Sequence, residues 1–230
     1  ALHKAKSEYI ALLAHQLRSP LTGTKWNIKT LLDGDWGKLN EKQKKFLSRS
    51  YETNEQMINL VNDLLNLTRI EDGRYDFAPK KTDIALLVAR VVGSFRDEAK
   101  AAGVRLVIKK PRAKARIPLV LLDAEKMEMA LGNLIDNAIR YNKPNGSVEV
   151  SYAREVHVAR IRVKDTGVGI PKEHLEKIFI PFFTTKPQGT GLGLPVVHGI
   201  VENHHGSLNV QSEVGAGTTF FLTFPAVKER

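Results

Sequence analysis

The chain of 230 residues is long enough for one large or two modest globular domains, and its 42% hydrophobic content excludes a disordered or fibrous protein. Its 35 basic and 25 acidic residues give a formal net charge of +10, which favours anionic partners without choosing among nucleotides, acidic proteins, nucleic acids and lipids. The absence of cysteine excludes disulfides, thiolate nucleophiles, iron–sulfur clusters and cysteine-ligated zinc.

The chain starts with a charged segment, residues 1–9, that lacks the apolar core of a signal peptide. No window approaches 18 consecutive apolar residues, so we expect a soluble chain without a membrane span. Because the chain opens inside a predicted helix and without methionine, we also expect that an upstream part, holding a sensor or a membrane anchor, precedes it.

Apolar residues recur at three- and four-residue steps from about Ser7 to Leu32, which predicts a long amphipathic helix. Pro20 lies inside it, so we expect a bend one turn after His15. The stretch Asp33–Gly37 is rich in turn formers, and a second periodic run extends from Phe46 to Ile70. The two helices predict an antiparallel hairpin. One such pair cannot enclose both apolar faces, and we expect it to dimerise into a four-helix bundle.

A polar break with a glycine, Glu71–Arg74, separates the hairpin from a region of alternating short elements. We therefore predict two domains, residues 1–72 and 73–230, joined by a hinge at this break. The elements expected in the second domain are a helix capped by Thr82 and closed by Gly103, a strand at 104–108, a helix at 124–141, strands at 147–153 and 156–163, a helix at 192–203, and strands at 207–211 and 218–224. Together these elements predict an α/β sandwich.

Two segments of the second domain carry candidate binding groups, the first on a helical face and the second at a glycine-containing turn. Asn133, Asn137 and Arg140 lie at i, i+4 and i+7, so two amides and a cation share one helical face. Asp165 ends a strand, and Gly167 and Gly169 let the backbone turn closely beside whatever the carboxylate holds. Taken singly, the first segment is also typical of a polar surface and the second of a plain turn.

Three further segments follow in order. Phe179–Lys186 puts aromatic residues before hydroxyls and a cation, although such aromatics alone are more typical of a core. Gly189–Leu194 opens a helix, so bare N–H groups and the positive helix end point at a spot suited to phosphate. It is neither a P-loop nor a dinucleotide fingerprint, because no GxxxxGK[ST] exists and the third glycine comes too early. Gly215–Phe220 also fits a hairpin turn.

Together, these five segments resemble the N, G1, F, G2 and G3 boxes of the ATP-binding domain shared by histidine kinases, gyrase-type ATPases, mismatch-repair ATPases and related chaperones. The resemblance implies that Asp165 accepts the adenine amino group, and that Asn137 ligates Mg²⁺ with Asn133 beside it. It implies that Arg140 and Lys186 face the phosphate oxygens of ATP. The other nucleotide-binding residues it implies are Tyr141, Gly167, Gly169, Phe182, Thr185, Gly189, Gly191, Leu192, Gly193 and Thr218.

The segment Ala14–Leu21 resembles the phosphoacceptor box of histidine kinases, so the resemblance covers nearly the whole chain, residues 7–224. It implies a cytoplasmic histidine kinase, acting as a homodimer, that autophosphorylates His15 from ATP. The phosphoryl group then passes to an aspartate of a response-regulator receiver domain. Because His15 sits beside the apolar stripe of its helix, we expect its imidazole on the outer face of the bundle.

Two neighbours of His15 bear on its chemistry. The family commonly has an acidic residue at the position of Gln16, and an amide can orient the imidazole but cannot take up its proton, so we predict slow autophosphorylation. Ser19 occupies the place where related kinases carry a group that positions water for receiver dephosphorylation, which makes phosphatase activity a second hypothesis. The main alternative is a nucleotide-binding pseudokinase scaffold. Nucleic-acid binding is not expected, because no recognised motif is present and the basic residues are dispersed.

Overall fold

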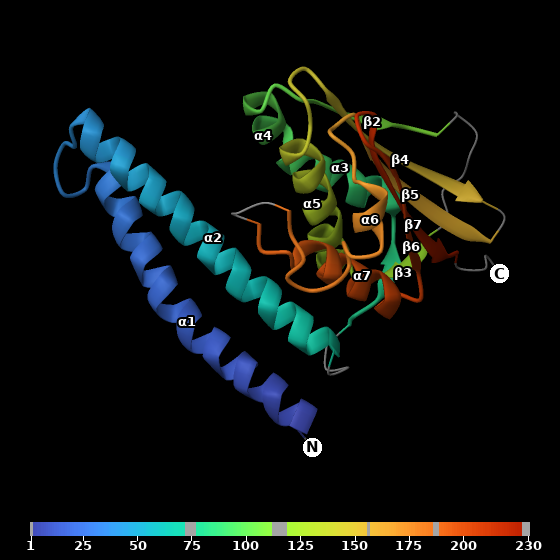
Figure 1. Cartoon of the computed structure of the whole chain (residues 1–230), viewed down its shortest axis with the longest axis horizontal. Helices are drawn as coiled ribbons and strands as arrows, with labels where there is room; N and C mark the ends of the chain where they lie inside the picture. Colours follow the sequence, from blue (N-terminus) through green and yellow to red (C-terminus); the bar gives the residue numbers. More distant parts are fainter. Residues whose placement is uncertain (1, 72–76, 112–118, 156, 186–188, 227–230) are drawn as a thin grey trace. The chain divides into compact units, whose positions relative to one another are not determined.

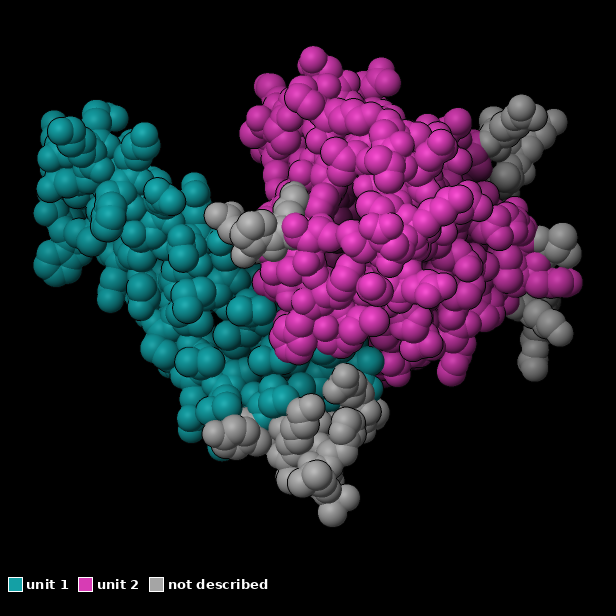
Figure 2. Space-filling model, viewed as in Figure 1, with its two compact units in different colours: residues 1–75 teal, residues 76–230 magenta. Residues whose placement is uncertain are grey.

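The computed structural model describes residues 2–71, 77–111, 119–155, 157–185 and 189–226, and for residues 2–9, 11, 15 and 71 it describes the backbone alone. The chain divides into two compact units, residues 1–75 and 76–230, coloured separately in Figure 2. The first unit is a helical hairpin and the second is an α/β domain (Figure 1). This confirms the predicted fold class.

The hairpin consists of α1 (Leu2–Asp33) and α2 (Glu41–Glu71), which lie side by side (Figure 1). A reciprocal cap starts α2: the backbone N–H of Gln43 donates to Asn40 Oδ1, and that of Asn40 donates to Gln43 Oε1, both at 2.9 Å. The α1 helix continues through Pro20 without interruption. The bend expected there stays a prediction.

A small apolar cluster holds the hairpin together. Ala14, Val61 and Leu65 are buried, and Leu21 packs against them. Many other large apolar side chains of this unit are exposed, namely Leu12, Leu13, Leu17, Trp26, Trp36, Phe46, Met57 and Leu60. One hairpin therefore encloses only part of its apolar surface.

The second unit is built on a five-stranded sheet in the order β2-β4-β5-β7-β6. The strands are β2 (Arg105–Lys109), β4 (Ser147–Glu155), β5 (Val158–Asp165), β6 (Ser207–Glu213) and β7 (Gly217–Pro225). Only the β2–β4 pair is parallel. Buried and more exposed residues alternate along β4, β5 and β7, so one face of the sheet is covered and the other faces solvent.

Helices cover the buried face. They are α3 (Ile84–Ser94), α4 (Arg96–Ala101), α5 (Ala124–Arg140), α6 (Lys172–Leu175) and α7 (Gly193–Asn203). Leu131, Leu134 and Ile135 of α5 are fully buried, as are Ile161 of β5 and Leu222 of β7, so α5 packs at the centre of this core. The core fixes the two helices, α5 and α7, that carry most of the predicted site.

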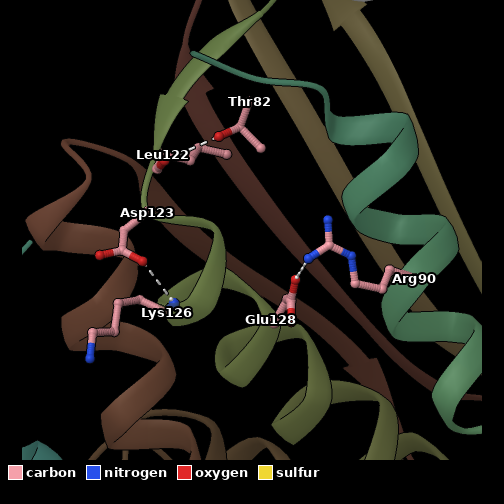
Figure 3. A network of polar contacts seen from close by, with 6 residues as sticks. All are labelled: Thr82, Arg90, Leu122, Asp123, Lys126 and Glu128. Atoms are coloured by element: carbon pink, nitrogen blue, oxygen red, sulfur yellow. Dashed lines mark hydrogen bonds and ion pairs between the residues drawn. The ribbon is translucent and has the colours of Figure 1, made fainter. Parts of the chain in front are cut away.

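A second, two-stranded sheet pairs β1 (Lys80–Thr82) with β3 (Val120–Leu122) and was not predicted from the sequence. The Thr82 hydroxyl donates to the Leu122 carbonyl at 3.1 Å (Figure 3). Asp123 follows β3 and caps α5, because its Oδ1 accepts from the backbone N–H of Lys126 at 3.2 Å. Arg90 of α3 and Glu128 of α5 form an exposed ion pair between the two helices.

The sequence-based helix running from Thr82 to Gly103 is wrong in two respects. Thr82 belongs to a strand, and the cap is Asp83, whose Oδ1 accepts from the N–H groups of Ala85 at 2.7 Å and Leu86 at 3.2 Å. The helix is also interrupted at Phe95, which has non-helical dihedral angles and separates α3 from α4. The Thr82 hydroxyl donates to the Leu122 carbonyl of the partner strand, and Asp83 caps the helix instead.

Candidate functional site

The carboxyl end of β5 holds Asp165 in a fixed position. Its side chain is only 7% exposed, and its Oδ1 accepts hydrogen bonds from the backbone N–H groups of Gly167 at 2.7 Å and Thr218 at 3.1 Å. Burial raises the pKa of the Asp165 carboxyl above its ordinary value of 3.8, and the two backbone hydrogen bonds oppose this rise. The loop after β5, with Gly167 and Gly169, is thus joined to β7 through one carboxyl group.

The end of α5 lies against the same loop. Tyr141 follows the last residue of α5, and its carbonyl accepts from the N–H of Val168 at 3.0 Å. The Tyr141 side chain is half-buried, and burial raises the pKa of its hydroxyl, with the nearby Arg140 opposing the rise and Asp136 adding to it. The structure therefore brings together the predicted residues Asp165, Gly167, Tyr141 and Thr218.

One amide of α5 is unsatisfied. Within the described part of the chain, Nδ2 of Asn133 is the buried side-chain nitrogen or oxygen that has no hydrogen-bond partner. The amide lies beside the start of α7, because a Cβ built on Gly193 would stand 3.6 Å from Asn133 Oδ1 and 3.9 Å from Nδ2. An orphaned buried amide is costly, and a polar ligand at this spot removes the cost.

The first turn of α7 presents backbone N–H groups that have no acceptor within the helix. Leu192, the residue before α7, is fully buried, and its N–H is held by the Thr190 hydroxyl at 3.3 Å. With Gly189 and Gly191 upstream, this end of the helix is open to an anion. The structure thus brings Asn133 close to Leu192 and Gly193.

Gly191 is required where the loop meets the aromatic segment. Its φ is +66°, and a Cβ there would stand 2.5 Å from the carbonyl carbon of Phe182 and 2.7 Å from the oxygen of Phe183. Phe182 itself has a φ of +66°, is 63% exposed, and donates its N–H to the Gly191 carbonyl at 3.0 Å. The two segments are in close backbone contact, and a side chain at Gly191 would clash with Phe182 and Phe183.

Arg140 is engaged by its own helix. Its Nε lies 2.6 Å from Oδ1 of Asp136, one turn earlier, and the side chain is 57% exposed. Glu98 of α4 is close to both, because its pKa is raised by burial and by the Asp136 carboxylate and lowered by Arg140. The predicted role of Arg140 toward phosphate stays a prediction. Thr185 is exposed, and Lys186 lies outside the described residues.

The predicted phosphoacceptor lies in α1, directly after the buried Ala14. The side chain of His15 is outside the described residues, so its exposure stays a prediction. Gln16 and Ser19, one and four residues later, are exposed. Arg18 reaches across the hairpin, where its Nη2 and Nε donate to Asn62 Oδ1 at 2.7 and 3.1 Å.

Sequence reasoning missed three residues that support this site. Asp136 holds Arg140, and Ser212 bonds to the glycine loop after β5 and to Thr218. His204, at the end of α7, joins this helix to the cap of α5. No local signal marks Ser212, which occupies an ordinary position in an alternating strand. Among the described residues, no cluster of His, Asp and Glu is arranged for a metal, and no helix is long and apolar enough to cross a membrane.

Asn137, on the same face of α5 as Asn133, is half-buried. Its amide oxygen is a hard ligand of the kind that Mg²⁺ takes from proteins, and the opening of α7 and the unpaired amide of Asn133 provide polar surroundings. The residues present therefore fit a nucleotide whose phosphates carry a magnesium ion.

In comparisons with known proteins, the chain matches two family models. Residues 122–228 match the family model described as histidine kinase-, DNA gyrase B- and HSP90-like ATPase, and residues 5–73 match the His Kinase A (phospho-acceptor) domain. The circadian input-output histidine kinase CikA of Synechococcus elongatus is 30% identical over 98% of this chain. The chain spans 30% of the length of that relative.

Two solved structures are also similar. The full-length structure of ShkA in complex with AMPPNP superposes with a TM-score of 0.81, at 25% identity over 96% of this chain and 46% of ShkA. The catalytic domain of the histidine kinase ThkA has a TM-score of 0.57 and 30% identity, over 66% of this chain and 96% of that domain. With an ATP-binding domain and a phosphoacceptor domain matched in order, the chain belongs to the histidine kinase family.

Proposed function

We propose that this chain transfers the γ-phosphoryl group of ATP to His15 and then to an aspartate of a response-regulator receiver domain. The observation that carries the nucleotide part of the proposal is the orphaned amide of Asn133 beside the opening of α7. A phosphate-bearing ligand resolves both features at once, because it accepts from the amide and from the bare N–H groups of the first helical turn.

The adenine end is set by Asp165. Because Oδ1 is held by two backbone N–H groups, the carboxyl group cannot rotate freely, and Oδ2 is left to accept from the amino group of a purine. Thr218 and Gly167 border the same place. The base and the triphosphate are thereby assigned to opposite ends of one site, between the Asp165 loop and the start of α7.

Asn137 would hold Mg²⁺ through its amide oxygen. When bound, the ion supplies positive charge against the phosphate oxygens. The chain's own contribution at this end is the helix terminus, with Arg140 and Lys186 as further cations. Arg140 would exchange its contact with Asp136 for a phosphate oxygen through a change of side-chain rotamer on the surface of α5.

At the acceptor, a neutral ring nitrogen of His15 attacks the γ-phosphorus. The bond between that phosphorus and the bridging oxygen of ADP breaks as the new phosphorus–nitrogen bond forms, and the ring N–H proton is then lost. Gln16 can accept a hydrogen bond from the ring but cannot take up the proton, so water or a partner group receives it. Phosphoryl transfer depends chiefly on alignment and charge neutralisation, which the nucleotide-binding unit supplies.

Dimerisation of the hairpin belongs to the same proposal. Leu13 and Leu17 lie one turn apart on α1, Met57 and Leu60 lie three residues apart on α2, and these four side chains are between 37% and 53% exposed. Two hairpins that bury these rows against each other form a four-helix bundle. Because the substrate is ATP, we also propose that the chain works in the cytoplasm.

The experiment is incubation of the chain with γ-labelled ATP and Mg²⁺, followed by acid and base treatment. Label on a histidine nitrogen is lost in acid and retained in base, whereas a serine ester shows the reverse. We expect base-stable label in the wild type, none in His15→Ala, and unchanged label in the matched control His157→Ala, which alters an exposed histidine of the other unit. ATP binding without any label would instead support the pseudokinase alternative.

A further inference from the structure

Ser212 occupies a three-way junction beside Asp165. It lies on β6 directly opposite Thr218 of β7, so the two side chains are on the same, covered face of the sheet. Its Oγ accepts from the backbone N–H of Ile170 at 2.8 Å, lies 3.0 Å from the carbonyl oxygen of Gly217, and lies 2.9 Å from the hydroxyl of Thr218.

The direction of these hydrogen bonds follows from the inventory of each group. A backbone N–H can only donate and a carbonyl oxygen can only accept, so Ser212 receives from Ile170 and gives its single proton to Gly217. Ser212 then has no proton for Thr218. The Thr218 hydroxyl must therefore donate its own proton to Ser212 Oγ.

Thr218 is left as an acceptor. Its side chain is only 7% exposed, and its hydroxyl proton is turned away toward β6, which leaves only oxygen lone pairs for any other contact. Asp165, joined to the backbone of Thr218, also offers a carboxyl oxygen. The two side chains at this end of the site consequently present acceptors.

We propose that Ser212 determines which base the site takes: by binding the hydroxyl proton of Thr218, it selects a purine with an amino group at position 6 and rejects one with a carbonyl there. An amino group donates to these acceptors, whereas a carbonyl oxygen meets them with its own lone pairs. The inference rests on the proposed function, because it takes Asp165 and Thr218 to face the base. Ser212 acts through Thr218 and is a positioning residue.

The test compares ATP with inosine triphosphate, which carries a carbonyl in place of the amino group at position 6 and a hydrogen on N1. The dissociation constants of both are measured with Mg²⁺ on the whole chain by titration calorimetry. We expect the wild type to prefer ATP and Ser212→Ala to lower this preference by about tenfold, because the freed Thr218 hydroxyl can then donate to the carbonyl. Ser212→Thr, which keeps the hydroxyl, restores the preference.

Controls separate selectivity from loss of structure. Ser151→Ala removes a serine hydroxyl from the solvent-facing side of the same sheet, where it accepts from Arg162 Nε at 3.1 Å, and leaves the ratio of dissociation constants unchanged. If Ser212 has a merely structural role, Ser212→Ala weakens the binding of both nucleotides equally and leaves the ratio of their dissociation constants unchanged. If Ser212→Ala does not fold, as judged by circular dichroism, Ser212→Cys retains the volume with a weak sulfur acceptor and is expected to lower the ratio by about threefold.

The outcomes are distinct for the two claims. A wild-type chain that binds neither nucleotide contradicts the proposed function. A wild-type chain that prefers ATP, together with a Ser212→Ala or Ser212→Cys variant of unchanged ratio, leaves the proposed function standing and overturns the role of Ser212. Equal affinity of the wild type for both nucleotides also overturns the role of Ser212.

Discussion

His204 joins the end of α7 to the start of α5, because its Nε2 accepts a 2.8 Å hydrogen bond from the backbone N–H of Asp123. Its Nδ1 lies 2.7 Å from the carbonyl of Ile200 and therefore carries the ring proton. The ring contacts Phe77 and Phe224 edge-on. Asp123 in turn accepts from the N–H of Ala78 at 3.0 Å. The two helices of the nucleotide site are thus tied at the ends remote from Asn133.

This arrangement predicts a loss of stability in mild acid. Burial lowers the pKa of His204 below its ordinary value of 6.5; the hydrogen bond to Ile200 and the carboxylate of Asp123 oppose the shift, and His205 adds to it. Above pH 6.5 the contribution of His204 to stability is complete. Below that pH the unfolded chain binds a proton that the folded chain does not, so stability falls by up to about 1.4 kcal/mol per pH unit until the folded-state pKa is reached.

Urea unfolding at pH 7.5 and 5.5, followed by circular dichroism, checks this expectation. His204→Gln should be less stable than the wild type at pH 7.5 and lose less stability on acidification. His157→Gln changes an exposed histidine and should retain the wild-type difference between the two pH values. An equal pH response in the wild type and His204→Gln would show that another group controls acid stability.

Gly191→Ala should weaken both the fold and ATP binding. The positive φ and the close backbone of Phe182 leave no place for the new methyl group, so we expect a loss of about 1–3 kcal/mol in the free energy of unfolding and at least about tenfold weaker ATP binding. Gly93→Ala is the matched control, because Gly93 is helical and has nothing within 4 Å of its built Cβ. It should bind ATP normally and be equally or more stable. Normal ATP binding by Gly191→Ala would contradict a role of the Gly189–Gly191 loop in holding the nucleotide.

Gln16→Glu should raise the initial rate of autophosphorylation at saturating ATP. A carboxylate next to His15 can accept the ring proton, and general-base help of this kind is worth about 10²–10⁴-fold. Gln16→Asn, which keeps an amide, is the control and should not accelerate the reaction. The rate of label incorporation during the first turnover measures both. No acceleration by Gln16→Glu would mean that proton removal does not limit the reaction.

Ser19→Ala tests the phosphatase hypothesis. Ser19 is exposed one turn after His15 and can orient a water molecule toward a receiver phosphate. We expect the variant to keep autophosphorylation and to lose most of any dephosphorylation of the cognate receiver, measured as release of inorganic phosphate. Undiminished release from the variant would remove Ser19 from this role.

The sequence predicted the long elements well, because their patterns are local. The periodicity of α1, α2, α5 and α7 and the alternation in β4, β5 and β7 are repeated over enough residues to be recognised. The strands β1 and β3 have three residues each and show no period, and the choice of Asp83 over Thr82 as a cap depends on the pairing of those strands. Short elements that depend on one another across the chain give little local signal.

The same distinction applies to the site. Asp165, Asn133 and Gly191 could be named from the sequence because they stand in short segments that follow one another in a fixed order. Ser212 and His204 act through contacts between parts of the chain that are distant in sequence. Asp136 acts through Arg140, whose side chain the resemblance assigned to the phosphates of ATP. Their roles emerge only when hydrogen-bond partners and directions are known.

The decisive measurement is the position of the phosphate after the chain has reacted with ATP and Mg²⁺. Proteolysis at alkaline pH followed by mass spectrometry locates it on a single peptide. We predict phosphate on His15 after reaction with ATP, and no phosphate there when ATP is replaced by a non-hydrolysable analogue. Phosphate on any other residue, with His15 unmodified, would contradict it.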